Sequence, residues 1–326
     1  MEKNLDNVEY LALSGGVGGA KLVLGLSQIL APEKLIVVAN TADDFKHIGL
    51  NISPDLDTIM YTLANLNNSE LGWGQTKETW QFLDALGRLD QETWFKIGDR
   101  DLATHIVRTT KLDNGETLSQ VTKELCFSLG VKHQLIPMTN DKVATVVHTK
   151  SGQSIPFQQY FVRDRCVPKV RGFEFQGIAT AAPSPSFLKS LESPKLRLII
   201  ICPSNPYVSI DPILRMRGVL DLIAERRIPV VAISPIISGQ ALKGPAAKMM
   251  EELGELASAI GIAKHYRTLY RDMLTGFIID EKDRRLEADF TEMGLRAIAT
   301  NTVMVTLQDR INLAQEVLRF GSRITI

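Results

Sequence analysis

Short apolar runs recur along this chain of 326 residues, and most of them end in turns rich in glycine, proline or acidic residues. Such runs are typical of buried strands in a parallel sheet when helically spaced apolar residues follow them. We predict strands over residues 8–13, 35–39, 196–202, 229–234 and 302–305. The pattern predicts an α/β fold, with a Rossmann-like, doubly wound and mostly parallel sheet.

The middle third of the chain departs from this rhythm. Residues 116–129 form an amphipathic helical pattern that ends at Gly130, and the alternation over 143–148 and 155–162 predicts a β-hairpin. We therefore expect a nucleotide- and phosphate-binding core built from two separate stretches of the chain. The predicted divisions are 1–70 and 190–326 for the core, and 71–189 for an inserted α+β region that caps the active site.

The turn after the first strand reads SGGVGG and leads directly into a helix. A helix N-terminus offers N–H groups and a positive dipole end to a phosphate. The spacing matches neither GxxxxGK[ST] nor a clean GxGxxG. A tight strand-to-helix turn would also favour glycine, but four glycines exceed what a turn requires. We predict that Gly15, Gly16, Gly18 and Gly19 bind an anion, with Lys21 beside them.

Acidic residues follow the second strand and open the next helix. Asp43 and Asp44 lie where the carboxyl edge of the sheet is expected, which is where ligands bind in such folds. Asp55 is near enough to the helix N-terminus for its presence to be explained by stabilisation of the helix dipole. Asp57 lies further into the helix, so this explanation suits it less well. Carboxylates beside a phosphate would repel it unless a divalent cation lay between them, and oxygen ligands indicate Mg²⁺. We predict Asp43, Asp44 and Asp57 as metal ligands.

Three further loops carry polar residues suited to a substrate. A charged loop follows the apolar triplet TWF, a proline-bounded Ser-Asn pair follows the strand at 196–202, and a glycine-containing loop precedes a helix near Pro245. From these loops we predict substrate contacts by Lys96, Asp99, Arg100, Ser204, Asn205, Ser209, Lys243 and Gly244. The neighbouring Trp94 and Phe95 are either core residues or a substrate wall, and His105 is expected to be a packed, hydrogen-bonded histidine.

Charge and cysteine content narrow the class of protein. Lys plus Arg and Asp plus Glu both number 37, so no overall field draws the chain to nucleic acid or to a membrane. The three cysteines lack CxxC spacing, which argues against a disulfide framework or a zinc site. The N-terminus has no signal-peptide core, and no apolar run approaches the roughly 20 residues of a membrane span. We expect a soluble, cytoplasmic protein that acts on small molecules.

Taken together, these motifs resemble the 2-phospho-L-lactate transferase family of coenzyme F-420 biosynthesis, called CofD or FbiA. The matching stretches lie in order along nearly the whole chain: SGGVGGAKL, NTADDFKHIGLNISPDLDTIMYTL, ETWFKIGDRDLATHI, FQQYFVRDRC, PSNPYVSI and SPIISGQALKGPAAKMM. One departure is visible, because Asp211 occupies the place where the family pattern VSIGPI has glycine.

The resemblance implies a reaction and a homodimer. A phospholactyl-type group (phospholactate, phosphoenolpyruvyl or phosphoglyceryl) would pass from a guanosine diphosphate donor to the deazaflavin Fo, releasing GMP and requiring Mg²⁺. Asp57 and Lys96 fall where the family contacts Fo, and we predict Asp57, Asp44 and Lys96 as catalytic residues. The PSNP and KGPAAK loops fall on the donor-nucleotide side.

Two other functions are compatible with parts of the pattern. A nucleotide-sugar-binding regulator of the YvcK type would share the glycine turn, but it would not need the GDRDLATH loop together with the PDLD acids. An NAD-dependent oxidoreductase fits less well, because the strand at 35–39 ends in Asn40 and lacks the acid that binds a ribose there.

Overall fold

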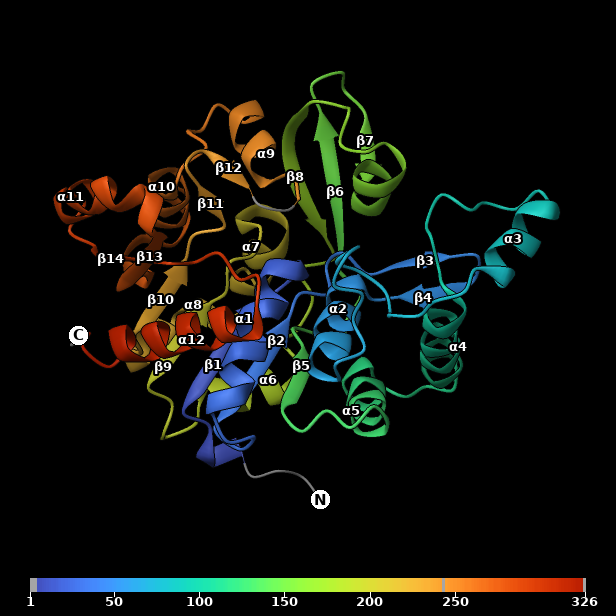
Figure 1. Ribbon diagram of the computed structural model, residues 1–326, viewed down its shortest axis with the longest axis horizontal. Coiled ribbons are helices and arrows are strands. Elements are labelled where there is room, and N and C mark those ends of the chain that lie inside the picture. The colour runs from blue at the N-terminus through green and yellow to red at the C-terminus, as the bar shows by residue number, and fades with distance from the viewer. Residues whose placement is uncertain (1–4, 242–243, 325–326) are drawn as a thin grey trace.

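A computed structural model describes residues 5–241 and 244–324 (Figure 1). Its centre is a seven-stranded sheet in the order β14-β13-β10-β9-β1-β2-β5, and all of its neighbouring strands pair in parallel. The strands are β1 (Tyr10–Ser14), β2 (Leu35–Ala39), β5 (Gln134–Pro137), β9 (Leu198–Ile201), β10 (Val230–Ile233), β13 (Gly276–Asp280) and β14 (Arg296–Thr300). This order confirms the predicted Rossmann-like α/β fold.

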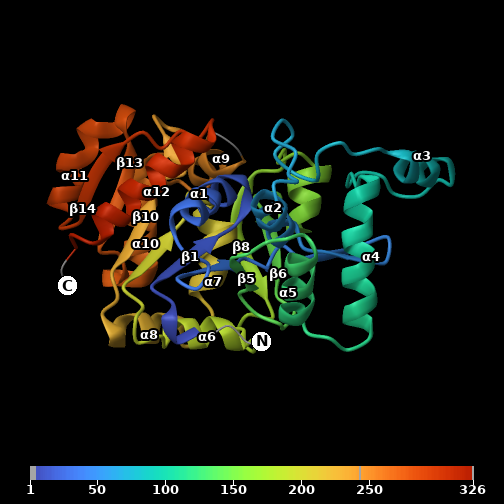
Figure 2. The same cartoon turned by 60° about the horizontal axis from the view of Figure 1, so that its bottom comes forward.

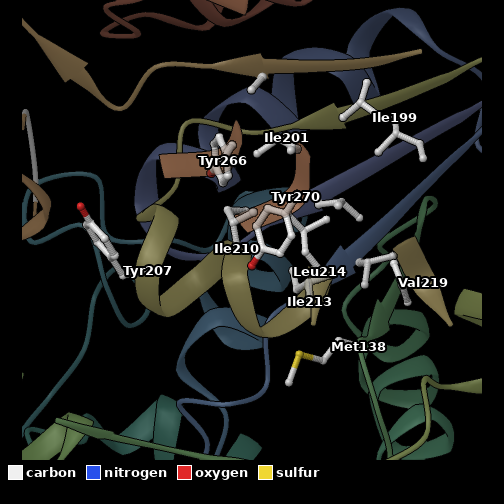
Figure 3. Packing of buried hydrophobic residues seen from close by; sticks show 14 of the residues in the cluster. Met138, Ile199, Ile201, Tyr207, Ile210, Ile213, Leu214, Val219, Tyr266 and Tyr270 are labelled. Carbon is white, nitrogen blue, oxygen red and sulfur yellow. The ribbon is translucent and has the colours of Figure 1, made fainter. Parts of the chain in front are cut away.

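Helices cover both faces of the sheet, because successive residues of each strand face opposite sides. In β1, Leu11 and Leu13 join one core, while Ala12 joins the other. The core around Ala12 is closed by α1 (Gly16–Ile29), α2 (Pro54–Leu63), α5 (Leu118–Ser128) and α12 (Leu307–Gly321). The opposite core, shown in Figure 3, is closed by α6 (Pro185–Leu191), α7 (Asp211–Leu214), α8 (Val219–Arg226), α9 (Ala246–Glu252), α10 (Ala259–Tyr270) and α11 (Glu287–Glu292).

The strand order reverses direction at β1. The chain leaves β1 for β2 on one side, while β9 pairs on the other side, with Leu13 opposite Ile201. The loops after β1 and β9 therefore lie side by side at the carboxyl edge, where such folds bind their ligands. A short π-helix, η3 (Pro206–Ile210), follows the β9 loop and leads into α7.

Smaller elements surround this edge. A three-stranded sheet is formed by β6 (Ala144–Thr149), β7 (Ser154–Pro156) and β8 (Val170–Gln176). The π-helix η2 (Gln159–Arg163) lies in the connection between β7 and β8. A hairpin of β3 (Phe45–His47) and β4 (Leu50–Ile52) lies with α3 (Gln81–Arg88) and α4 (Asp99–Asp113). Figure 2 shows α3 and α4 on the side of the molecule away from α11 and α12. Of the helices in the described chain, none has the length and apolar character needed to cross a bilayer.

The remaining elements are short connections. They are η1 (Leu5–Asn7), β11 (Ile236–Ile237), β12 (Gln240–Ala241), η4 (Arg271–Met273) and η5 (Glu281–Leu286). The strands β11 and β12 pair as an antiparallel hairpin in the segment after β10.

Three sequence predictions need correction. The expected strand at 302–305 is an unpaired segment after β14, and both β13 and β14 were overlooked. The expected second hairpin strand at 155–162 ends at Pro156, because the chain turns into η2. The strand β5 pairs with β2, so part of the predicted insertion 71–189 belongs to the central sheet.

Candidate active site

A cavity of about 780 Å³ opens where the loops after β1 and β9 meet. This volume lies within the usual range for small-molecule sites. Eleven of the predicted site residues line it: Gly15, Gly16, Gly18, Lys21, Asp43, Asp57, Lys96, Ser204, Asn205, Ser209 and Gly244. Of the other predicted residues that the structure describes, Gly19, Asp44, Asp99 and Arg100 lie outside this lining. Lys243 lies outside the described residues.

The glycine turn packs tightly against the loop after β9. The Gly15 amide donates to the Ser204 hydroxyl (3.1 Å), which in turn donates to the Gly15 carbonyl (2.8 Å). A Cβ at Gly18 would overlap the carbonyl oxygen of Pro203, and one at Gly19 would overlap the Ser204 hydroxyl. Glycine is therefore required here for the close approach of two loops. The same approach brings the first turn of α1 to the cavity, where its N–H groups have no partner within the helix.

Asp55 reaches the N-terminus of α1 instead of serving only its own helix. The Gly16 amide donates to Asp55 Oδ1 (2.7 Å), and Asn40 Nδ2 donates to Asp55 Oδ2 (3.0 Å). Asn40 Nδ2 also donates to the Val208 carbonyl oxygen (3.2 Å) and thereby joins the loops after β2 and β9. Burial raises the pKa of Asp55 to about 6, despite these hydrogen bonds. The interpretation of Asp55 as a helix-dipole residue was thus incomplete.

Asp43 and Asp44 bring two further carboxyl groups to this region. Burial raises the pKa of both well above the usual range, and the charge of Asp55 raises that of Asp43 further. Asp44 Oδ2 accepts from the Ser53 hydroxyl (2.7 Å), whereas Asp43 Oδ1 and Asp44 Oδ1 are buried without a hydrogen bond from the described residues. Unpaired oxygens among crowded carboxyl groups fit a divalent cation with oxygen ligands. Only Asp43 of this pair lines the cavity in the described chain.

Asp57 has a different partner. The guanidinium of Arg108, from α4, donates to both of its carboxylate oxygens, with Nη1 to Oδ2 at 3.0 Å. Burial disfavours the charge of Arg108, but Asp57 outweighs this effect and raises the Arg108 pKa. The two side chains form a buried ion pair, with Arg108 1% and Asp57 5% exposed. Because its oxygens are already occupied, Asp57 suits a metal less well than Asp43 does.

The ion pair extends along α4. Arg108 Nη1 also lies 3.2 Å from His105 Nδ1, and an arginine only donates, so a neutral His105 carries its proton on Nε2. His105 Nε2 lies 3.3 Å from Asp101 Oδ2, and the Tyr61 hydroxyl donates to Asp101 Oδ1 (2.6 Å). Asp57, Asp101 and His105 are close enough to ligate one ion. The guanidinium already supplies the positive charge that such an ion would bring.

Aromatic side chains form the wall beside Lys96. The Phe45 and Phe95 rings pack edge to face with centroids 4.9 Å apart, and His47 packs on Trp94 at the same distance. Trp94, Phe95 and the exposed Lys96 line the cavity, which supports the substrate-wall interpretation over a purely structural one.

Asp99 and the backbone of Arg100 contact neighbouring segments outside the cavity lining. Asp99 accepts hydrogen bonds from the Thr79 hydroxyl and from the amides of Gln81 and Phe82, at the start of α3. The Arg100 amide donates to Glu78 Oε2 (2.8 Å). The geometry therefore gives neither Asp99 nor Arg100 a contact with the cavity.

The Asp211 side chain forms its hydrogen bonds with α10, although its backbone N–H donates to the Pro206 carbonyl oxygen in the loop after β9. Its buried carboxylate accepts from the Tyr270 hydroxyl (2.9 Å) and lies 3.1 Å from His265 Nε2, both in α10. Its φ of −51° is ordinary for a helix, so the position has no conformational need for glycine. The Asp211 carboxylate thus anchors α7 to α10 on the face of the sheet opposite α1.

The predicted site residues did not include Asn40, Tyr61, Asp101 or Arg108, although Asp101 belongs to the charged loop from which substrate contacts were predicted. One signal was present, because Asp101, His105 and Arg108 follow each other at helical spacing and would share one face of α4. A charged stripe on a buried helix face predicts an internal partner of opposite charge.

Comparison with known proteins identifies the family. The family model described as 2-phospho-L-lactate transferase CofD matches residues 11–305. A 2-phospho-L-lactate transferase of Methanosarcina mazei is 37% identical over 95% of this chain and 99% of its own length. A phosphoenolpyruvate transferase of Streptomyces griseus is 36% identical over 97% of this chain and 99% of its own length.

Solved structures support the fold independently. The crystal structure of a upf0052 family member from Bacillus halodurans has a TM-score of 0.65 at 12% identity, covering 96% of this chain and 99% of that one. Such low identity bears on the fold alone. The match to the family model and the two curated relatives carry the further conclusion: this chain belongs to the CofD family of transferases.

Proposed function

We propose that this protein transfers a phospholactyl-type group from a guanosine diphosphate donor to the deazaflavin Fo, releasing GMP. The observation that carries the proposal is the single cavity in which the α1 N-terminus and the β9 loop meet an aromatic wall. The first two features suit a diphosphate, and the wall suits a flat tricyclic ring. Family membership supports the same reaction class.

In this reaction a ribityl hydroxyl of Fo attacks the phosphorus that bears the three-carbon acid. The new oxygen–phosphorus bond forms and the bond from that phosphorus to the oxygen of GMP breaks, with its electron pair leaving on GMP, while the hydroxyl proton passes to the Asp57 carboxylate. Asp57 lines the cavity and Arg108 holds its carboxylate, which supports a role for Asp57 as the acceptor of that proton. Transfers of this kind depend mainly on positioning and charge neutralisation.

Magnesium fits the carboxyl groups beside the α1 N-terminus. Asp43 would hold it, because one of its buried oxygens has no hydrogen bond from the described residues. Asp55 is the neighbouring carboxyl group that also lines the cavity. When bound, the ion neutralises the diphosphate and stabilises the departing GMP. Lys21 lies at the same end of the cavity, with its Nζ donating to the Met304 carbonyl oxygen (2.9 Å).

The test is a turnover assay with Fo, Mg²⁺ and guanylylated 2-phospholactate, phosphoenolpyruvate or phosphoglycerate as separate donors. Mass analysis should find GMP and the Fo phosphodiester in equal amounts, and both should disappear when Mg²⁺ is chelated or Fo is left out. Tight binding of a guanine nucleotide without either product would instead support the YvcK-type regulator.

A further inference from the structure

Arg165 combines a strained backbone with a place in the cavity. Its φ is +48°, and that of the next residue, Cys166, is +57°. Left-handed φ is uncommon for residues with a Cβ, and such residues cluster at functional sites. Arg165 is among the residues that line the cavity, and it lies in the segment that follows η2.

The strained segment is held on both sides. The Cys166 amide donates to the Tyr160 carbonyl (2.9 Å), and the Val167 amide donates to the Asp164 carbonyl (2.9 Å). The buried Tyr160 has the Lys248 ammonium 5.9 Å from its ring centroid, and Lys248 belongs to α9. The segment is therefore fixed against α9, and the loop before α9 lines the same cavity with Gly244 and Pro245.

The charge of Arg165 is left open to the cavity. Among the described residues that line it, the permanent cations are Lys21, Lys96 and Arg165. Lys21 donates to a carbonyl oxygen, whereas the Arg165 side chain has no hydrogen bond or ion pair with any described residue. Its neighbour Arg163 pairs with Asp164 at 2.8 Å. An unpaired guanidinium is a planar fork of donors suited to a carboxylate.

We propose that Arg165 binds the carboxylate of the three-carbon acid on the donor, a role that rests on the proposed function. The donor carries anions of two kinds, a diphosphate and this carboxylate. The glycine turn and the carboxyl groups beside it serve the diphosphate. The carboxylate lies beyond the reacting phosphorus, at the end away from guanosine.

The position of Arg165 fits that end of the donor. Its segment is anchored on α9, next to the Gly244–Pro245 loop that the family resemblance assigns to the donor nucleotide. The same segment also brings Phe161 and Val162 to the cavity that the aromatic wall lines. A residue at this junction meets the part of the donor that faces the acceptor. Lactyl, enolpyruvyl and glyceryl acids all end in a carboxylate, so Arg165 recognises the feature that they share.

The experiment compares Arg165→Met with the control Arg163→Met. The control also removes a guanidinium, but from a residue that is not among those described as lining the cavity. Three constants are measured: the Kd of GDP by calorimetry, the KM of guanylylated 2-phospholactate, and the KM of Fo. GDP has the diphosphate but lacks the acid. Arg165→Met should raise the donor KM about tenfold to a hundredfold, because a hydrogen-bonded charge pair is lost. The Kd of GDP and the KM of Fo should stay within about twofold of their wild-type values. In Arg163→Met, all three constants should stay within about twofold of wild type.

Three outcomes would overturn the assignment. An equal loss of GDP affinity in Arg165→Met would place the guanidinium at the phosphates. A rise confined to the KM of Fo would place it at the acceptor, and an unchanged donor KM would remove it from recognition. A wild-type protein that neither binds GDP nor forms product would overturn the proposed function together with this inference, whereas an active wild type with an unaffected Arg165→Met overturns the inference alone.

Discussion

Replacing Arg108 with methionine isolates the buried ion pair at the centre of the site. Methionine keeps an unbranched apolar stem but removes the guanidinium that donates to Asp57, to His105 and, at 3.4 Å, to the Asn51 carbonyl. Asp57 would remain 5% exposed with its closest remaining basic group, His105 Nδ1, 3.7 Å away. Breaking one side of a buried pair costs about 3–5 kcal/mol. That is a large part of a net stability of about 5–15 kcal/mol.

Urea unfolding measures this loss. With a slope near 3 kcal/mol per molar urea, the midpoint should fall by about 1–1.7 M. Arg163→Met makes the same replacement at an exposed pair and should change the free energy of unfolding by no more than about 0.5 kcal/mol. Adding Asp57→Asn to Arg108→Met should restore part of the stability, because it removes the uncompensated charge. A loss below about 1 kcal/mol for Arg108→Met would show that water, and not the arginine, balances Asp57.

Three further results are expected. Gly18→Ala should weaken GDP binding strongly in calorimetry, because the added methyl group overlaps the Pro203 carbonyl oxygen and pushes the glycine turn away from the loop after β9. Unchanged GDP binding would show that the glycine turn does not contact the diphosphate. Lys96→Ala should raise the KM for Fo and spare donor affinity, and equal weakening of both would place this lysine at the phosphates. Burial raises the pKa of Cys126 and Cys202 to about 12, so at pH 8 only about one thiol in ten thousand is ionised. Both should react with a disulfide reagent in urea but scarcely in the native protein.

The glycine turn and the β9 loop were predictable because each follows an apolar strand, and a parallel sheet brings strand ends to one edge. Gly15, Asp43 and Ser204, each predicted just after such a strand, all line the cavity. The late strands were harder to see. Residues 302–305 are apolar but unpaired, while β14 pairs although its first residue, Arg296, is exposed.

The partners of the acids could not be read from the chain. Arg108 lies 51 positions from Asp57, and the amide that binds Asp55 lies 39 positions away in α1. Such pairings depend on how α2 packs against α1 and α4, which no local spacing encodes. Sequence therefore indicated which residue types gather at the site, while the packing decided that Asp57 pairs with arginine and that Asp43 keeps an oxygen free.

In the proposed reaction, a hydroxyl of Fo attacks the acid-bearing phosphorus of the donor within this cavity. Fo labelled with ¹⁸O at the attacking ribityl hydroxyl tests it directly, with the products separated and weighed by mass spectrometry. We expect the label to be retained in the Fo phosphodiester and the released GMP to be unlabelled. An Fo adduct carrying guanosine monophosphate, or release of GMP without any labelled phosphodiester, would contradict it.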